Sequence, residues 1–211
     1  MELTWHGHSR FRLRAGGLVW WLETRVDTST LDAGANVIVL DAQSSADVGR
    51  SGPDGMPVVD GPGEYELRGV PVVAVRMSEP GLGRADRMVA YRLEVDGVRV
   101  GYVGARAPLA SSAPRVVAEV APVDVAIVPI GDGHGLGVAD AIAFARSLEA
   151  KAIVPYVPDG DAPAIELVRR LCREIGSDPD ATVRALTMTG ATMPAVPRVV
   201  VLENWAAEAS A

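Results

Sequence analysis

Apolar and polar residues alternate along the first half of the chain, and this alternation predicts short β-strands. Two alternating runs, residues 10–14 and 18–23, flank Gly16-Gly17, which is typical of a β-hairpin. A second hairpin is predicted around Asp96-Gly97, because this pair tolerates the positive φ angles of a tight turn. Residues 37–40 are instead continuously apolar, which indicates a strand covered on both faces.

The pattern changes after about residue 108, where buried strands alternate with helices. Apolar runs predict strands, and helical spacing predicts helices between them. The predicted strands are 123–131, 151–157, 182–188 and 197–204, and the predicted helices are 114–122, 138–150 and 162–176. In the last helix the apolar stripe consists of Ile165, Val168, Leu171, Cys172 and Ile175, and Gly176 is the expected stop.

This order of elements predicts an α/β (α+β) architecture in which two sheets pack face to face with helices outside. No long Gly/Ser-rich linker separates the two halves, so we expect one domain over residues 1–205. Residues 206–211 are expected to form a disordered tail.

Composition and charge narrow the classes of function. Of 211 residues, 48% are hydrophobic and 22% charged, which is ordinary for a soluble globular protein, and no apolar run is long enough for a membrane span. The net charge of −7 without a basic patch disfavours nucleic-acid binding. The N-terminus lacks the layout of a secretion signal, and the single cysteine agrees with a reducing compartment. We therefore expect a cytoplasmic protein without nucleic-acid or membrane partners.

Several motifs resemble a known family. They occur in the order "LTWHGHSRFRL", "VVDGPGEYELRGVPV", "VRVGYVGA", "PVDVAIVPIGDG" and "AIVPYV". Together they are similar to the small branch of metallo-β-lactamase-fold hydrolases that includes L-ascorbate-6-phosphate lactonases and related predicted Zn-dependent hydrolases. The likeness runs from about residue 3 to residue 158. It implies a four-layer αββα sandwich, the metallo-β-lactamase fold, with one or two metal ions at one edge.

The resemblance also implies where metal ligands would lie. The family's His-x-His-x-Asp-His loop follows a buried strand and falls on the ligand positions Ala42, Ser44, Ala46 and Asp47. The next two positions, a His and a bridging Asp, map to Tyr102 and Ala105. The last His maps near Tyr156 or Val157. None of the family's histidine ligands is present, and Asp47 alone at the loop positions could coordinate a cation.

Metal chemistry explains why this loss matters. A catalytic zinc or manganese needs three or more N, O or S donors around one point, and it then lowers the pKa of a bound water. Alanine has no donor, a neutral serine is a poor one, and Tyr102 would have to ionise. The sequence therefore predicts no cofactor, no metal ligands and no catalytic residues, and it favours a non-catalytic protein over an enzyme.

A rebuilt metal site is the alternative. His6 and His8 are two residues apart, so on an extended strand both imidazoles would face the same way. With Asp132 and His134 of the glycine-rich loop "GDGHGLG" they could hold zinc or manganese. Otherwise His8 is a hydrogen-bonded structural residue and His134 an exposed loop residue. The same loop precedes a helix and could bind an anion weakly, although Asp132 would repel phosphate.

Other candidate chemistry is sparse. Glu64 and Glu66 are spaced to share one face and could act as an acid–base pair, but the stretch around them is more typical of a turn and strand start. Cys172 lies on an apolar helix stripe, which favours the core over a nucleophile. The alternating arginines from Arg10 to Arg14 indicate a solvated strand face more than an anion-binding stripe. An exposed Trp20 or Trp21 would indicate a subunit interface.

These observations lead to two competing hypotheses. The first is a non-catalytic protein that binds an unknown small molecule, or assembles as a homo-oligomer or with another protein. Its emptied cleft would be lined by His8, Asp47, Glu64, Tyr102, Asp132 and His134. The second is a metal-dependent hydrolase of a small ester, lactone or phosphate that uses a rebuilt site.

Overall fold

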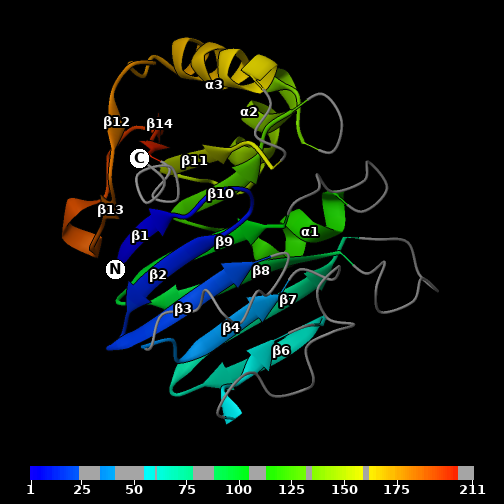
Figure 1. The fold of residues 1–211 in the computed structure, drawn as a ribbon. Coiled ribbons are helices and arrows are strands. Elements are labelled where there is room, and N and C mark those ends of the chain that lie inside the picture. The colour runs from blue at the N-terminus through cyan, green and yellow to red at the C-terminus, as the bar shows by residue number, and fades with distance from the viewer. Residues whose placement is uncertain are drawn as a thin grey trace.

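Two large β-sheets face one another in the computed structural model of the chain (Figure 1). The structure describes residues 1–23, 34–40, 55–59, 61–77, 88–104, 113–131, 135–158 and 162–203. The two sheets and the helices outside them agree with the α/β sandwich architecture expected from the sequence. Predicted metal positions 42, 44, 46, 47 and 105 lie outside the described residues, as do Asp132 and His134.

The first sheet contains the N-terminal strands in the order β13-β1-β2-β3-β4-β5. Its strands are β1 (Glu2–Trp5), β2 (Phe11–Ala15), β3 (Leu18–Glu23), β4 (Val37–Leu40), β5 (Val58–Val59) and β13 (Leu186–Thr187). The predicted hairpin is present: β2 and β3 are antiparallel, and Gly16 and Gly17 adopt φ values of 60° and 73°. Alternation buries Phe11 and Leu13, whereas Arg12 is half-buried and Arg14 exposed.

The second sheet has seven strands in the order β14-β11-β10-β9-β8-β7-β6. They are β6 (Gly63–Leu67), β7 (Val70–Arg76), β8 (Val89–Val95), β9 (Val98–Val103), β10 (Val125–Pro129), β11 (Ala152–Tyr156) and β14 (Arg198–Val199). The hairpin predicted at Asp96-Gly97 joins β8 and β9, with φ values of 51° and 70° at the two turn residues. Strands β9, β10 and β11 run parallel, so their carboxyl ends meet at one edge.

The described α-helices lie on the outer side of the seven-stranded sheet, whereas the short 3₁₀ helix Gly190–Thr192 follows β13 (Figure 1). The α-helices are α1 (Ala113–Val120), α2 (Val138–Ser147) and α3 (Ala162–Ile175). Their apolar stripes cover a second buried cluster that includes Val116, Ile142 and Leu171. Within the described ranges no α-helix covers the outer face of the six-stranded sheet.

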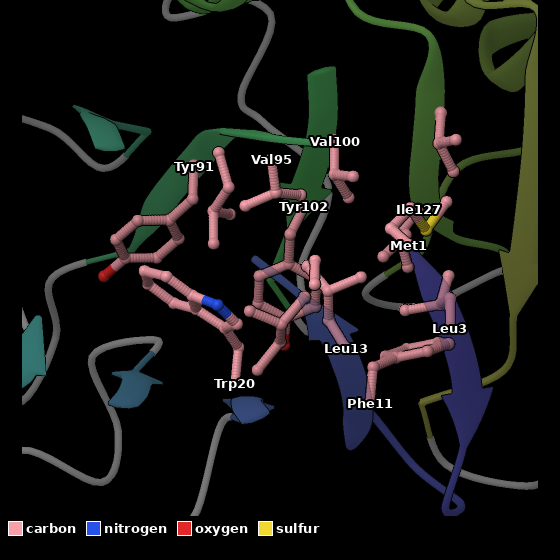
Figure 2. Close-up of a cluster of buried hydrophobic side chains, with 14 of the residues drawn as sticks. Met1, Leu3, Phe11, Leu13, Trp20, Tyr91, Val95, Val100, Tyr102 and Ile127 are labelled. Carbon is pink, nitrogen blue, oxygen red and sulfur yellow. The ribbon is translucent and has the colours of Figure 1, made fainter. Parts of the chain in front are cut away.

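The space between the sheets is filled by large side chains from both of them (Figure 2). Phe11, Leu13 and Trp20 from the first sheet meet Tyr91 and Tyr102 from the second, and all five are fully buried. Burial of each such side chain stabilises the fold by about 1.5–3 kcal/mol. Trp20 and Trp21 are 0% and 2% exposed. Because both are buried, neither indicates a subunit interface.

The C-terminal part of the chain differs from the prediction in two ways. The predicted strand 182–188 is two short strands, β12 (Thr182–Val183) and β13, and strand 197–204 is likewise β14 and β15 (Val201–Leu202). Strand β13 pairs with β1 and β14 with β11, so this segment connects the two large sheets. Ile165, expected on the buried stripe of α3, is 55% exposed, because that stripe begins only at Val168.

A partly buried ion pair between Arg99 and Asp124 fixes the strands at the centre of the second sheet. The Asp124 carboxylate, which is 7% exposed, accepts hydrogen bonds from Nε (3.2 Å) and Nη2 (3.1 Å) of Arg99 and from the Arg99 main-chain N–H (2.8 Å). The hydrogen bond to Asp124 also raises the pKa of Arg99. The Asp124 carbonyl accepts the N–H groups of Lys151 and Ala152. Asp124 therefore joins β9, β10 and β11 just before their parallel run.

We expect Asp124→Asn to lower the free energy of unfolding by about 1.5–3 kcal/mol, because charge-assisted hydrogen bonds to a buried acceptor are lost. Urea denaturation at an unchanged m-value measures this loss. The control is Glu119→Gln, which breaks the exposed Arg115–Glu119 pair on α1 and should cost less than about 0.5 kcal/mol. Equal losses in the two variants would contradict the role given to Asp124.

Candidate functional site

A tight turn at residues 6–10 reaches the edge where the parallel strands of the second sheet end. Strand β1 stops at Trp5, and the chain reverses through Gly7 and His8, whose φ values are 86° and 48°. The turn is closed by main-chain hydrogen bonds from Arg10 to Gly7 and from His6 to Arg10. The Trp5 indole donates to the His8 carbonyl at 2.8 Å, which fixes the turn from below.

Two long-range hydrogen bonds attach this turn to the second sheet. Nδ1 of His8 lies 2.9 Å from the carbonyl oxygen of Pro158, just beyond β11. The Tyr102 hydroxyl on β9 donates to the carbonyl oxygen of Ser9, also at 2.9 Å. His8 is therefore a hydrogen-bonded residue of the turn, as one interpretation of the sequence predicted.

Tyr102 and Tyr156 lie beneath the turn and are 0% and 1% exposed. The Tyr156 hydroxyl donates to the Val103 carbonyl at 2.9 Å, which ties β11 to β9 across β10. The ring of Phe11 makes edge-to-face contacts with both tyrosines, with centroids 6.3 Å and 5.2 Å apart. Such contacts add about 0.5–1.5 kcal/mol each beyond the buried area. Both tyrosines are thus parts of the core.

The extended strand that would turn His6 and His8 to one face is absent. Strand β1 ends at Trp5, and Gly7 and His8 have positive φ angles. Nε2 of His6 lies 3.0 Å from the Thr4 hydroxyl, and its ring stands edge-on to Trp21 at 4.9 Å. The Arg10 guanidinium lies over the same Trp21 ring at 4.8 Å, so the described neighbours of His6 belong to the outer face of the first sheet.

The structure brings together only some of the predicted cleft residues. His8 and Tyr102 meet at the turn, although the buried Tyr102 contributes no open surface. Glu64 is exposed on β6, the edge strand, three strands from β9 and so about 14 Å away across the sheet. Asp47, Asp132 and His134 lie outside the described residues, so their membership of a cleft stays a prediction.

The described donors do not fit a catalytic metal centre. A coordinating tyrosine must lose its proton, but the hydroxyls of Tyr102 and Tyr156 each donate that proton to a main-chain carbonyl. Val157 has no donor atom in its side chain. In the described part of the chain, no three residues among His, Cys, Asp and Glu are grouped to hold an ion.

A hollow that the sequence did not indicate lies between α1 and α2. Its volume is about 780 Å³, and its lining includes Val117, Leu136 and Phe144, with Asp140 at its edge. The sequence did not predict this hollow, because the residue pattern of each helix does not show that the two helices are neighbours.

No described helix is long and apolar enough to cross a membrane.

A family model, the beta-lactamase superfamily domain, matches residues 2–157. The chain belongs to this family. The match includes both sheets except β13 and β14, and it ends before α3. No curated protein sequence matches the chain.

Solved structures of this superfamily share the fold. A candidate Zn-dependent hydrolase of the metallo-β-lactamase superfamily from Thermotoga maritima superposes with a TM-score of 0.73 and 23% identity, over 96% of this chain and 98% of that chain. Igni18, a metallo hydrolase from Ignicoccus hospitalis, gives a TM-score of 0.60 and 16% identity, over 89% and 99%. An isothiocyanate hydrolase from Delia radicum gut bacteria gives 0.58 and 10%, over 97% of each chain. At these identities the likeness establishes the fold alone.

Replacing Tyr102 by phenylalanine should lower the free energy of unfolding by about 1–2 kcal/mol, because the buried Ser9 carbonyl loses its donor. Tyr102→Leu also removes the ring contacts with Phe11 and Tyr91, so its loss should be larger, about 3 kcal/mol or more. Denaturant unfolding of both variants separates the hydroxyl from the ring. Wild-type stability of Tyr102→Phe would show that the hydrogen bond is not needed.

The thiol of Cys172 should react only when the protein unfolds, because the side chain is fully buried and burial raises the pKa of the thiol. An aromatic disulfide reagent at pH 8 should modify it slowly in buffer and rapidly in about 6 M urea. This behaviour would confirm a core residue rather than a nucleophile.

The same shift in the pKa of Cys172 gives a pH dependence with a definite sign. Above about pH 8.5 the unfolded chain loses the thiol proton while the folded chain keeps it, so the free energy of unfolding falls as the pH rises. Below that pH both states keep the proton and the contribution is constant. Cys172→Ala should remove this part of the alkaline loss, which urea titrations at pH 8 and pH 10 would measure. An identical alkaline loss in the variant would contradict the assignment.

Proposed function

We propose that this chain is a non-catalytic member of its family, which acts by binding a small molecule or by assembling with other chains. The observation that carries the proposal is the state of Tyr102. It stands where the resemblance implies a metal ligand, and it is fully buried with its hydroxyl donated to Ser9.

The physical argument rests on what Tyr102 would need to do in a metal centre. A phenolate at this position would place negative charge 2.9 Å from the Ser9 carbonyl oxygen, in the core between the sheets. Loss of the proton would replace the hydrogen bond between these two oxygens with repulsion between them. The hydroxyl is therefore suited to joining the turn to β9 and poorly suited to coordination.

The remaining positions support the same proposal from chemistry alone. Ala42, Ala46 and Ala105 carry no donor atom in their side chains, and Ser44 is a weak neutral ligand. Asp47 supplies one carboxylate, which is fewer than the three protein ligands that a catalytic zinc ordinarily has. These residues therefore do not supply the three protein ligands that would hold a catalytic zinc with a bound hydroxide.

A metal-dependent hydrolase with a rebuilt site is the second candidate. It is favoured by the names of the structures that share the fold, such as the candidate Zn-dependent hydrolase of Thermotoga maritima. Fold alone does not carry chemistry from one protein to another. A small ester, lactone or phosphate would be the substrate class under this candidate, and zinc or manganese the metal.

Metal content separates the two candidates. Protein purified without chelator should carry less than about 0.1 equivalent of zinc, manganese or iron per chain. The reason is that a site with a Kd weaker than micromolar loses its ion during gel filtration. Elemental analysis by mass spectrometry measures this. His6→Ala/His8→Ala should leave the content at the same background.

The opposite result would overturn the proposal. About one or two metal ions per chain, lost in His6→Ala/His8→Ala or on chelation, together with esterase or phosphatase activity that returns with the metal, would establish the hydrolase. A matched control is Glu174→Gln, an exposed residue of α3 paired with Arg170, which should change neither measurement.

A further inference from the structure

The hollow between α1 and α2 has the dimensions of a ligand pocket. Its volume of about 780 Å³ falls within the range of roughly 300–1,000 Å³ found for small-molecule sites. Its walls come from the start of α1, the connection 135–137 and the length of α2. It is formed by elements on the outer side of the seven-stranded sheet, whereas the turn at residues 6–10 belongs to the other sheet.

The α1 wall is held in place by contacts with the second sheet. Val116 and Val120 are buried against it, and Nη1 of Arg92 on β8 donates to the carbonyls of Val120 and Ala121 at 3.2 Å. These bonds satisfy carbonyl groups that the end of α1 would otherwise leave without partners.

The opposite wall is equally fixed. Leu136 donates to the Pro129 carbonyl at 2.9 Å, and its own carbonyl accepts the Gly131 N–H at 3.2 Å. Gly135 passes so close to Gly131 that a Cβ atom there would lie 2.4 Å from the Gly131 nitrogen, so only glycine fits. A ligand would therefore enter a hollow whose walls are already ordered, which lowers the entropic cost of binding.

The lining gives the chemistry of the ligand. Val117, Leu136 and Phe144 contribute apolar side chains to the lining. Ala143 and Ser147 of α2 also line the hollow, and their side chains are small. Among the described lining residues the charged side chain is Asp140, an exposed residue of the first turn of α2, and the described residues provide no ion-pair partner for it. Its carboxylate complements a positive charge.

From this arrangement we infer that the α1–α2 hollow binds a small molecule with an apolar, aromatic or aliphatic body and a protonated amine, and that the amine pairs with Asp140. A protein partner is disfavoured because the lining has ten residues, whereas a stable protein interface uses about 20–30 residues a side. A second copy of the chain is disfavoured further by the net charge of −7 on each. The inference does not depend on the metal content of the protein.

Three probes with one naphthalene body test the inference: 1-naphthylmethylamine, 1-naphthylmethanol and 1-naphthylacetate. Binding to the full chain is measured by titration calorimetry and by saturation-transfer NMR. The amine should bind about two- to fivefold tighter than the alcohol, and the acetate should bind most weakly. Asp140→Asn should remove the preference for the amine and leave the affinity for the alcohol unchanged.

Two further variants locate the site. Ala143→Trp fills the hollow from an exposed helix position and should weaken all three probes at least about tenfold while circular dichroism stays that of the wild type. Glu66→Gln removes a carboxylate on the distant strand β6 and should change nothing.

The inference is overturned if the amine and the alcohol bind equally, if Asp140→Asn leaves the amine affinity unchanged, or if no probe binds below about 5 mM. It is also overturned if Ala143→Trp changes the sedimentation coefficient from oligomer to monomer, since the hollow would then be an interface between copies. Zinc content plays no part in these outcomes, so they are distinguishable from a failure of the proposed function.

Discussion

The contact of Phe11 with Tyr102 and Tyr156 is the interaction on which the arrangement at the edge of this protein depends. Phe11 begins β2 of the first sheet, and the two tyrosines belong to strands of the second sheet that flank β10. The three rings fill the space between the sheets where the parallel strands end. Because they also place the hydroxyls of both tyrosines against main-chain carbonyls, packing and hydrogen bonding hold the turn at residues 6–10 to the second sheet.

At the positions of Tyr102 and Tyr156, packing in the core and coordination of a metal ion place opposite demands on the side chain. A side chain that binds a metal must point a lone pair at an open site, whereas the oxygen atoms of Tyr102 and Tyr156 point their protons at carbonyl groups inside the protein. The resemblance implies ligand positions at these strand ends, and here the hydroxyls of both tyrosines bind main-chain carbonyls instead. A chain can therefore keep the fold of the family without keeping its metal chemistry.

The distribution of helices produces a second consequence. Because the described α-helices share one sheet face, α1 and α2 lie side by side over a common apolar floor without filling the space between them. Small residues at Gly135, Gly137 and Ala143 leave that space open, and hydrogen bonds from Arg92 and Leu136 keep both walls fixed. A binding role can therefore be carried by the outer layer of the sandwich, independently of the metal positions at its edge.

The sequence by itself determined the strand and helix types, both hairpins and the family, because local alternation, turn residues such as Asp96-Gly97 and short motifs are encoded by neighbouring residues. It also determined that the metal positions lack histidines, since this is a matter of residue identity. Tertiary structure decided that β1 ends before His6 and His8, that Glu64 stands far from Tyr102, that the C-terminal strands divide between two sheets, and that a hollow lies between α1 and α2. These facts depend on contacts between residues far apart in the chain, and no local pattern specifies which distant surfaces meet.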